Sequence, residues 1–111
     1  MIQKGDLLEE NSAKILIGVP QGIPRELVAE YLERCRGGLR LLNAAVGQNH
    51  FEQVRVLGHR MKGTGAPYGF SRLTEIGAGI EQAAKDQNGD ALRRYVAELE
   101  GYLSRVEIAG E

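Results

Sequence analysis

Residues 57–65 read LGHRMKGTG, a stretch with the spacing of an amphipathic helix. Leu57 and Met61 are four positions apart, and Val54 extends their apolar stripe by about one more turn. Glycine costs about 1 kcal/mol relative to alanine inside a helix, yet glycines stand at positions 58, 63 and 65. Helix stability alone therefore does not account for this stretch, and part of it is expected to form a helix end or a working surface.

Further amphipathic helices are predicted around this stretch. Apolar residues recur every three and four positions in four segments: residues 24–47, about 50–66, 71–85 and about 90–106. Short polar turns separate the segments, Pro67 and Gly69 must end the second helix, and Ser71 is the expected N-cap of the third. The pattern predicts an all-α fold, an antiparallel up-and-down four-helix bundle over residues 23–108.

The first 22 residues form a separate segment that lacks this helical period. Its apolar, β-branched run contains Ile15, Leu16, Ile17 and Val19 and ends at Pro20. A lone strand leaves its backbone groups unpaired, and no second strand-like run is evident. Residues 1–22 are therefore expected to be an extended lead whose apolar run packs on the bundle, with a dimer-forming strand as the less favoured alternative.

The composition sets limits on partners and location. The 111 residues suit one domain, and 15 acidic residues nearly balance 14 basic ones, so no basic field for nucleic acid is present. The single Cys35 has apolar neighbours at helical spacing, which predicts a buried, reduced thiol. No run of about 18 apolar residues and no signal-peptide profile occur. A cytoplasmic monomer without membrane association is expected, and Met1 is compatible with a free-standing protein.

His59 is the residue of this stretch best suited to chemistry. At 100° per residue it lies about 140° from Val54 and about 160° from Leu57 and Met61, so it faces away from the core stripe. Five residues are expected within about 60° of it on the helix surface: Arg55, Val56, Lys62, Gly63 and Ala66.

These surroundings favour reversible phosphorylation of the imidazole. A neutral imidazole is a nucleophile near pH 7, and the cations Arg55, Arg60 and Lys62 would stabilise an attached phosphoryl group. Lys62 is one turn from His59 and is the best placed of the three. Gly63, four positions on, leaves room for the phosphoryl group and its donor, which gives a reason for glycine in a helix.

These residues resemble the histidine-containing phosphotransfer (HPt) domain of two-component phosphorelays. The resemblance covers residues 24–108 and rests on a His-x-x-Lys-Gly core followed by small residues and a leucine, here His59, Lys62, Gly63, Gly65, Gly69 and Leu73. It implies that His59 exchanges a phosphoryl group with the aspartate of a receiver domain, that Lys62 assists electrostatically and that Gly63 keeps the site open. Gly58 departs from the alanine usual in the family, and Pro67 is also less usual.

The expected partner is the receiver domain of a response regulator, a hybrid sensor histidine kinase, or both. Its contacts are expected at Arg55, Val56, Arg60, Ala66 and Gly69. The chain has no ATP-binding or autokinase motif and no paired acidic cluster, so a phosphocarrier rather than an enzyme is predicted. No cofactor is expected in this chain, and Mg²⁺ is expected only in the receiver.

Other functions remain as alternatives. A non-phosphorylated four-helix adaptor that only binds a receiver or a kinase is the main one. A metal-binding bundle is disfavoured because His50, the only other histidine, lies about 180° around the helix from His59. A hydrolase or acyltransferase is disfavoured because Cys35 is expected to be buried and Ser71 to be a cap. Tyr68 and Phe70 are expected to be packing residues.

Overall fold

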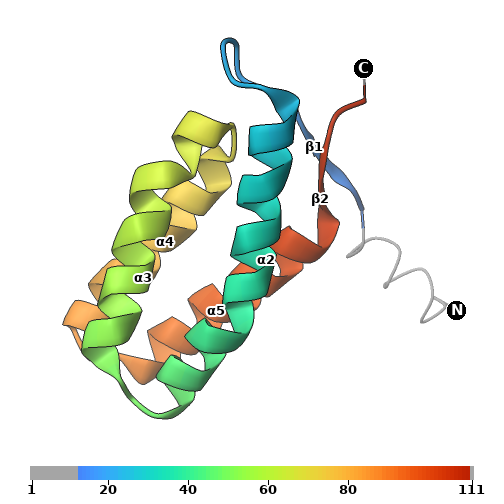
Figure 1. The fold of residues 1–111 in the computed structure, drawn as a ribbon. Coiled ribbons are helices and arrows are strands. Elements are labelled where there is room, and N and C mark those ends of the chain that lie inside the picture. The colour runs from blue at the N-terminus through green and yellow to red at the C-terminus, as the bar shows by residue number, and fades with distance from the viewer. Residues whose placement is uncertain (1–12, 111) are drawn as a thin grey trace, which may run out of the picture.

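The fold is an all-α four-helix bundle, as the sequence pattern predicts (Figure 1). The computed structural model describes residues 13–110. Its helices are α2 (Arg25–Gly47), α3 (Phe51–Thr64), α4 (Ser71–Lys85) and α5 (Gly89–Arg105), with the 3₁₀ helix η1 (Ala66–Tyr68) between α3 and α4. No helix in this described part of the chain is both long and apolar enough to cross a membrane.

The helix ends agree with the expected turns, except at Ser71. Gly69 has φ +97°, a left-handed conformation that ends η1 and that glycine adopts without strain. Ser71 is the first helical residue of α4 rather than its N-cap: Phe70 occupies the cap position, and no side chain caps the helix. Asn88, in contrast, caps α5 by accepting a hydrogen bond from the backbone N–H of Ala91 at 3.0 Å.

The core is built from the apolar stripes of all four helices. Its largest fully buried side chains are Phe70, Leu73, Ile76, Ile80, Leu92, Leu99, Leu103, Val28, Val54 and Val106. Each such side chain contributes roughly 1.5–3 kcal/mol through removal from water. Tyr68 stacks on Tyr31 with ring centroids 4.5 Å apart, and Phe70 is fully buried, so both are packing residues as expected.

Helices α3 and α4 approach each other most closely where two glycines meet. A Cβ atom at Gly77 would lie 2.5 Å from the backbone nitrogen of Lys62 and 2.8 Å from the carbonyl oxygen of Gly58. A Cβ atom at Gly58 would lie 2.7 Å from the backbone nitrogen of Glu81. Neither position can hold a side chain at this separation, which explains Gly58, the glycine without a sequence-based reason.

Gly65 is required by a similar approach. It is the C-cap of α3, and a Cβ atom there would lie 2.7 Å from the backbone nitrogen of Thr74. The start of α4 therefore packs directly on the end of α3. Together with the Gly58–Gly77 contact, this packing aligns the two helices along their length and brings the side chains of α4 beside those of α3.

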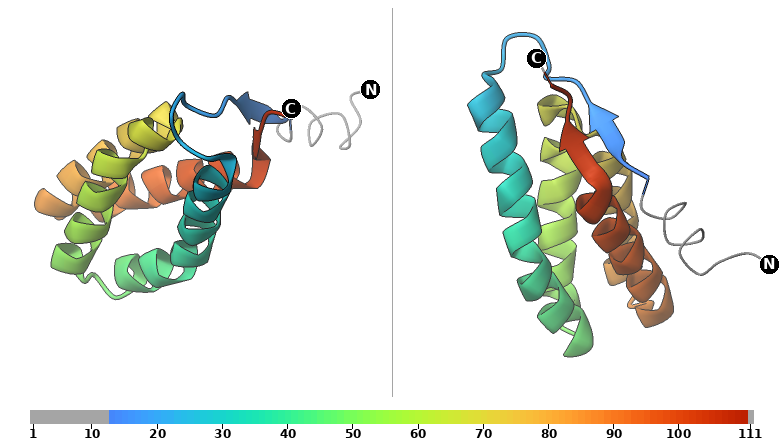
Figure 2. Two further views of the ribbon diagram at one scale, coloured as in Figure 1. Left: turned by 45° about the horizontal axis from the view of Figure 1, so that its top comes forward. Right: turned by 90° about the vertical axis from the view of Figure 1, so that its right-hand side faces the viewer.

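A two-stranded parallel sheet corrects the expectation that the N-terminal run has no strand partner. Strand β1 (Ile15–Ile17) pairs with β2 (Val106–Ile108), with Ile15 opposite Val106 (Figure 2). The partner was missed because Val106 continues the apolar spacing of α5, whereas its backbone is extended, at φ −76° and ψ 137°. Ile15, Ile17 and Val19 pack against the core, while residues 1–12 of the expected lead lie outside the described residues.

Arginine side chains of α2 attach the C-terminal strand to the bundle. Arg36 donates to the carbonyl oxygens of Leu103 at 3.1 Å and Val106 at 3.0 Å, and Arg25 donates to that of Ala109 at 2.7 Å. Cys35, expected to be buried, is only half-buried and lines a cavity between α2 and α3.

Candidate functional site

His59 lies on the exposed side of α3, with 64% of its side chain accessible to solvent. Val54, on the apolar stripe of α3, is buried in the core. The helical period therefore places His59 on the outer side of the helix. This orientation agrees with the direction worked out from helical geometry. The imidazole is held at the edge of the contact between α3 and α4.

The partner of His59 is a glutamate that sequence reasoning missed. The Nδ1 atom of His59 lies 3.0 Å from Oε2 of Glu81, and Nζ of Lys62 donates to Oε1 of Glu81 at 3.1 Å. Glu81 belongs to α4, and its side chain is only 8% exposed. A second ammonium group, that of Lys85, has its Nζ atom 3.8 Å from Oε2 of the same carboxylate.

The Glu81 carboxylate is held in its ionised form. The hydrogen bond from Lys62 lowers the pKa of Glu81 the most; the bond from His59 and the charge of Lys85 act in the same direction, and burial opposes them. An ionised carboxylate only accepts hydrogen bonds, so the proton in the contact with His59 must be on Nδ1 of the imidazole. In the neutral ring, the lone pair is then on Nε2.

The space beside the imidazole is open at Gly63. A Cβ atom at Gly63 would have no neighbouring heavy atom within 4 Å, and the residue is exposed on the turn that follows His59. The end of α3 is fixed next to it by Thr74, which donates to the carbonyl oxygen of Lys62 at 3.0 Å and accepts from the backbone N–H of Ala66 at 2.8 Å. The glycine therefore leaves room for an incoming group beside a fixed backbone.

The other residues expected around His59 are only partly gathered there. Arg55 forms a two-pronged ion pair with Glu52, at 2.9 and 2.6 Å, one turn before His59. Val56 is half-buried, and Ala66 is exposed. Arg55 and Val56 belong to α3, the helix of His59, whereas Ala66 is the first residue of η1.

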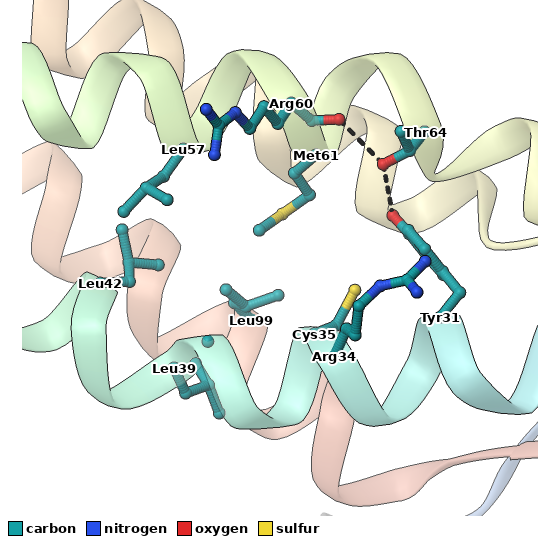
Figure 3. Close-up of a pocket in the computed structure, with 11 residues that line it drawn as sticks. Tyr31, Arg34, Cys35, Leu39, Leu42, Leu57, Arg60, Met61, Thr64 and Leu99 are labelled. Atoms are coloured by element: carbon teal, nitrogen blue, oxygen red, sulfur yellow. Dashed lines mark hydrogen bonds between the residues drawn. The ribbon is translucent and has the colours of Figure 1, made fainter.

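Arg60 and Gly69 do not lie at the imidazole. Arg60 lines the cavity that faces α2, on the other side of α3 (Figure 3). Gly69 packs against the N-terminal segment: a Cβ atom there would lie 3.1 Å from the carbonyl oxygen of Gly18 and from the ring of Pro20. The structure therefore groups His59 with Lys62 and Gly63, but groups neither Arg60 nor Gly69 with them.

Glu81 and Lys85 are the residues that sequence reasoning did not find. They are one turn apart on α4, and Glu81 follows Gly77 by one further turn. A signal was present in the glycines at 58 and 77, since a glycine inside each of two helices permits a close contact between them. It does not by itself say which α4 side chain meets which α3 side chain.

Residues 13–110 contain no group of three His, Cys, Asp or Glu side chains that could hold a metal ion. The Glu81 carboxylate already accepts hydrogen bonds from a lysine and a histidine. What the cluster offers chemically is an oriented imidazole with an accessible Nε2, two nearby ammonium groups and open space for an anionic group.

The comparison with known families agrees with this chemistry. A sequence model of the Hpt domain family matches residues 26–109, which include all four helices except the first residue of α2. No curated protein and no solved structure matches the chain. The matched range includes His59, Lys62 and Glu81.

Proposed function

The chain belongs to the Hpt domain family, and on that premise we propose that His59 is the residue that accepts and donates the phosphoryl group, through Nε2. Members of this family are phosphotransfer intermediates of two-component signalling, phosphocarriers rather than autokinases. The observation that carries the assignment is the Glu81 carboxylate bridging His59 and Lys62 next to the open Gly63.

The transfer step uses the tautomer that Glu81 imposes. Nε2 of His59 attacks the phosphorus of the receiver's aspartyl phosphate; the P–N bond forms as the P–O bond breaks, and the aspartate carboxylate leaves with the electron pair. Nδ1 keeps its proton, so the phosphorylated ring is cationic, and Glu81 stabilises it. Return transfer to another receiver is the reverse of this step.

Lys62 has a second role in this mechanism. Its side chain is 47% exposed and starts one helical turn from His59, so its ammonium group can reach a phosphoryl group on Nε2. Phosphoryl transfer depends mainly on positioning and on neutralising charge, so a lysine near the developing phosphohistidine lowers the barrier. We place the Mg²⁺ that such a transfer uses in the receiver's acidic pocket rather than in this chain.

We place the receiver, or the receiver part of a hybrid kinase, over the outer side of α3. Its short-range contacts would be with Val56 and Ala66, and its acidic pocket would be attracted to Lys62 and Lys85. Arg55 is occupied by Glu52, so it would contribute to docking only by exchanging partners.

The test is phosphoryl uptake from a receiver domain phosphorylated with radioactive phosphate. The wild-type chain should take up an acid-labile, base-stable label, and ³¹P NMR should place it on Nε2. The chain contains only two histidines, so His50→Gln is a matched control that should keep the label, while His59→Gln should lose it.

Two results would contradict the proposal. One is a label retained in His59→Gln. The other is a wild-type chain that binds receivers and takes up no label from any of them, which would favour the adaptor alternative.

A further inference from the structure

The outer face of α2 carries large apolar side chains in contact with solvent. Among residues 13–110, three large apolar side chains are exposed, and two of them, Leu27 and Leu41, belong to α2. They are 14 positions apart, which places them within about 40° of each other around the helix and about 21 Å apart along it. Helix α2 forms one corner of the bundle (Figure 2), so this face is accessible to another molecule.

The charges on this face are separated along the helix. Glu26 and Glu30 lie in the N-terminal half of α2, and Arg34 and Arg40 lie in its C-terminal half. All four are exposed, and none forms an ion pair with another residue of the range 13–110. Glu30 and Arg34 stay unpaired even though they are four positions apart, a spacing that allows a pair within one helix.

The helix dipole does not account for this order of charges. It favours acidic residues in the first turn and basic residues in the last turn, and its effect is confined to those turns. Glu26 is in the first turn of α2, but the last turn contains no basic residue. The positions of Glu30, Arg34 and Arg40 therefore need another reason.

Two glycines in the middle of α2 have no packing role within the described chain. A Cβ atom at Gly37 or Gly38 would meet nothing within 4 Å, and both residues are exposed. Each costs about 1 kcal/mol relative to alanine inside a helix. Exposed glycines remove side chains that would keep a second helix at a distance. The middle of the face is therefore suited to the close approach of another helix.

We propose that a second copy of this chain docks on the outer face of α2, with the two α2 helices antiparallel. Glu30 and Arg40 are symmetric about position 35, so a two-fold axis there sets Glu30 of each copy opposite Arg40 of the other. Leu27 and Leu41 are symmetric about position 34, so nearly the same axis brings each exposed leucine to its counterpart on the other copy.

Charge complementarity is the argument for a second copy and for its direction. The face carries both signs of charge, in an order that matches itself when the helix is reversed. A parallel pair of helices would set Glu30 against Glu30 and Arg40 against Arg40, which is repulsive. The dimer uses α2, whereas the cluster around His59 belongs to α3 and α4, so this proposal does not rest on the proposed function.

Sedimentation velocity measures the self-association directly. The wild-type chain should form dimers reversibly as its concentration rises from micromolar to millimolar, and added salt should weaken the dimer because exposed charges contribute to it. In NMR spectra, the amide signals of Glu30, Gly37 and Leu41 should shift with protein concentration. Those of His59 and Glu81 should not.

Charge reversal distinguishes the antiparallel dimer from other contacts. Glu30→Arg and Arg40→Glu each set like charges opposite each other at two symmetric contacts, so each should weaken dimerisation about tenfold. An equimolar mixture of the two variants again has opposite charges at both contacts and should associate as tightly as the wild type. Arg94→Glu, at an exposed position of α5, changes the net charge as Arg40→Glu does and should leave dimerisation unchanged.

All three substitutions are at exposed positions, so the variants should fold, and thermal melts of dilute samples check this. The proposal is overturned if the wild type stays monomeric over this concentration range, as the composition led us to expect. It is also overturned if Arg40→Glu dimerises like the wild type, or if the mixture associates no better than either variant alone. Concentration-dependent shifts confined to β1 would overturn it as well and would assign self-association to that strand.

Discussion

Replacing Gly77 with alanine should impair a site that Gly77 does not itself form. The added Cβ atom would lie 2.5 Å from the backbone nitrogen of Lys62, whereas ordinary contacts begin at 3.4 Å. Since the obstructing atoms belong to the backbone, α3 and α4 must separate by about 0.9 Å at this point. The same separation would lengthen the 3.0 Å contact between His59 and Glu81 beyond hydrogen-bonding distance.

The expected change in stability is a balance of two terms. Overpacking costs about 1–3 kcal/mol, and replacing a helical glycine with alanine returns up to about 1 kcal/mol. Gly77→Ala should therefore lower the free energy of unfolding by about 1–2 kcal/mol, or the melting temperature by roughly 4–15 °C. Gly37→Ala is the control: its Cβ atom meets nothing within 4 Å, so it should stabilise the chain by about 0.5–1 kcal/mol.

The assays are urea denaturation and the rate of phosphoryl uptake from a phosphorylated receiver. We expect Gly77→Ala to slow uptake even at temperatures where the chain is fully folded, because the imidazole loses the group that fixes its tautomer. If Gly77→Ala is as stable as Gly37→Ala and transfers at the wild-type rate, the argument from close helix packing is refuted.

Four further outcomes follow from the same geometry. Lys62→Ala should slow phosphoryl transfer about tenfold in a kinetic assay and leave the chain folded, with a small loss of stability in urea denaturation, because the Glu81 carboxylate loses its strongest hydrogen-bond donor. Gly63→Leu should impair transfer in a kinetic assay more than it changes the melting temperature, and a collapse of the fold would show that this glycine serves packing. Because the pKa of Glu81 is lowered in the folded chain, its contribution to stability is complete above the ordinary carboxyl pKa and is lost as pH falls through the lower folded value. Urea titrations of Glu81→Gln across that acidic range should lack this part of the pH dependence. Arg36→Ala removes donors to two carbonyl oxygens and should cost about 1–2 kcal/mol in urea denaturation, with faster hydrogen exchange in β1.

The helices and the orientation of His59 could be predicted because both depend on local periodicity. A residue's angular position around its own helix follows from sequence spacing, and His59 is indeed on the outer side of α3. The motif that carries the family resemblance lies in one continuous stretch of sequence, from His59 in α3 to Leu73 at the start of α4, and the family match confirms the resemblance.

Glu81 and the β1–β2 sheet could not be predicted because both depend on contacts between distant segments. The register of α4 against α3 is set by backbone contact at Gly58 and Gly77, which no helical angle within α4 reveals. Val106 satisfies the apolar spacing of α5 equally well as a helical residue and as the first residue of β2. Arg60 was expected beside His59 because its sequence neighbours are there, although its own position lies about 100° around the helix.

The pairing of β1 with β2 has a consequence for the order of folding. Ile15 and Val106 are 91 positions apart, so their contact closes a loop that contains all four helices. Closing so long a loop costs about 4 kcal/mol of chain entropy in an unstructured chain, but much less once the helices have brought α2 and α5 together. The strands should therefore pair last, and a population with formed helices and open ends should precede the native state on the folding pathway.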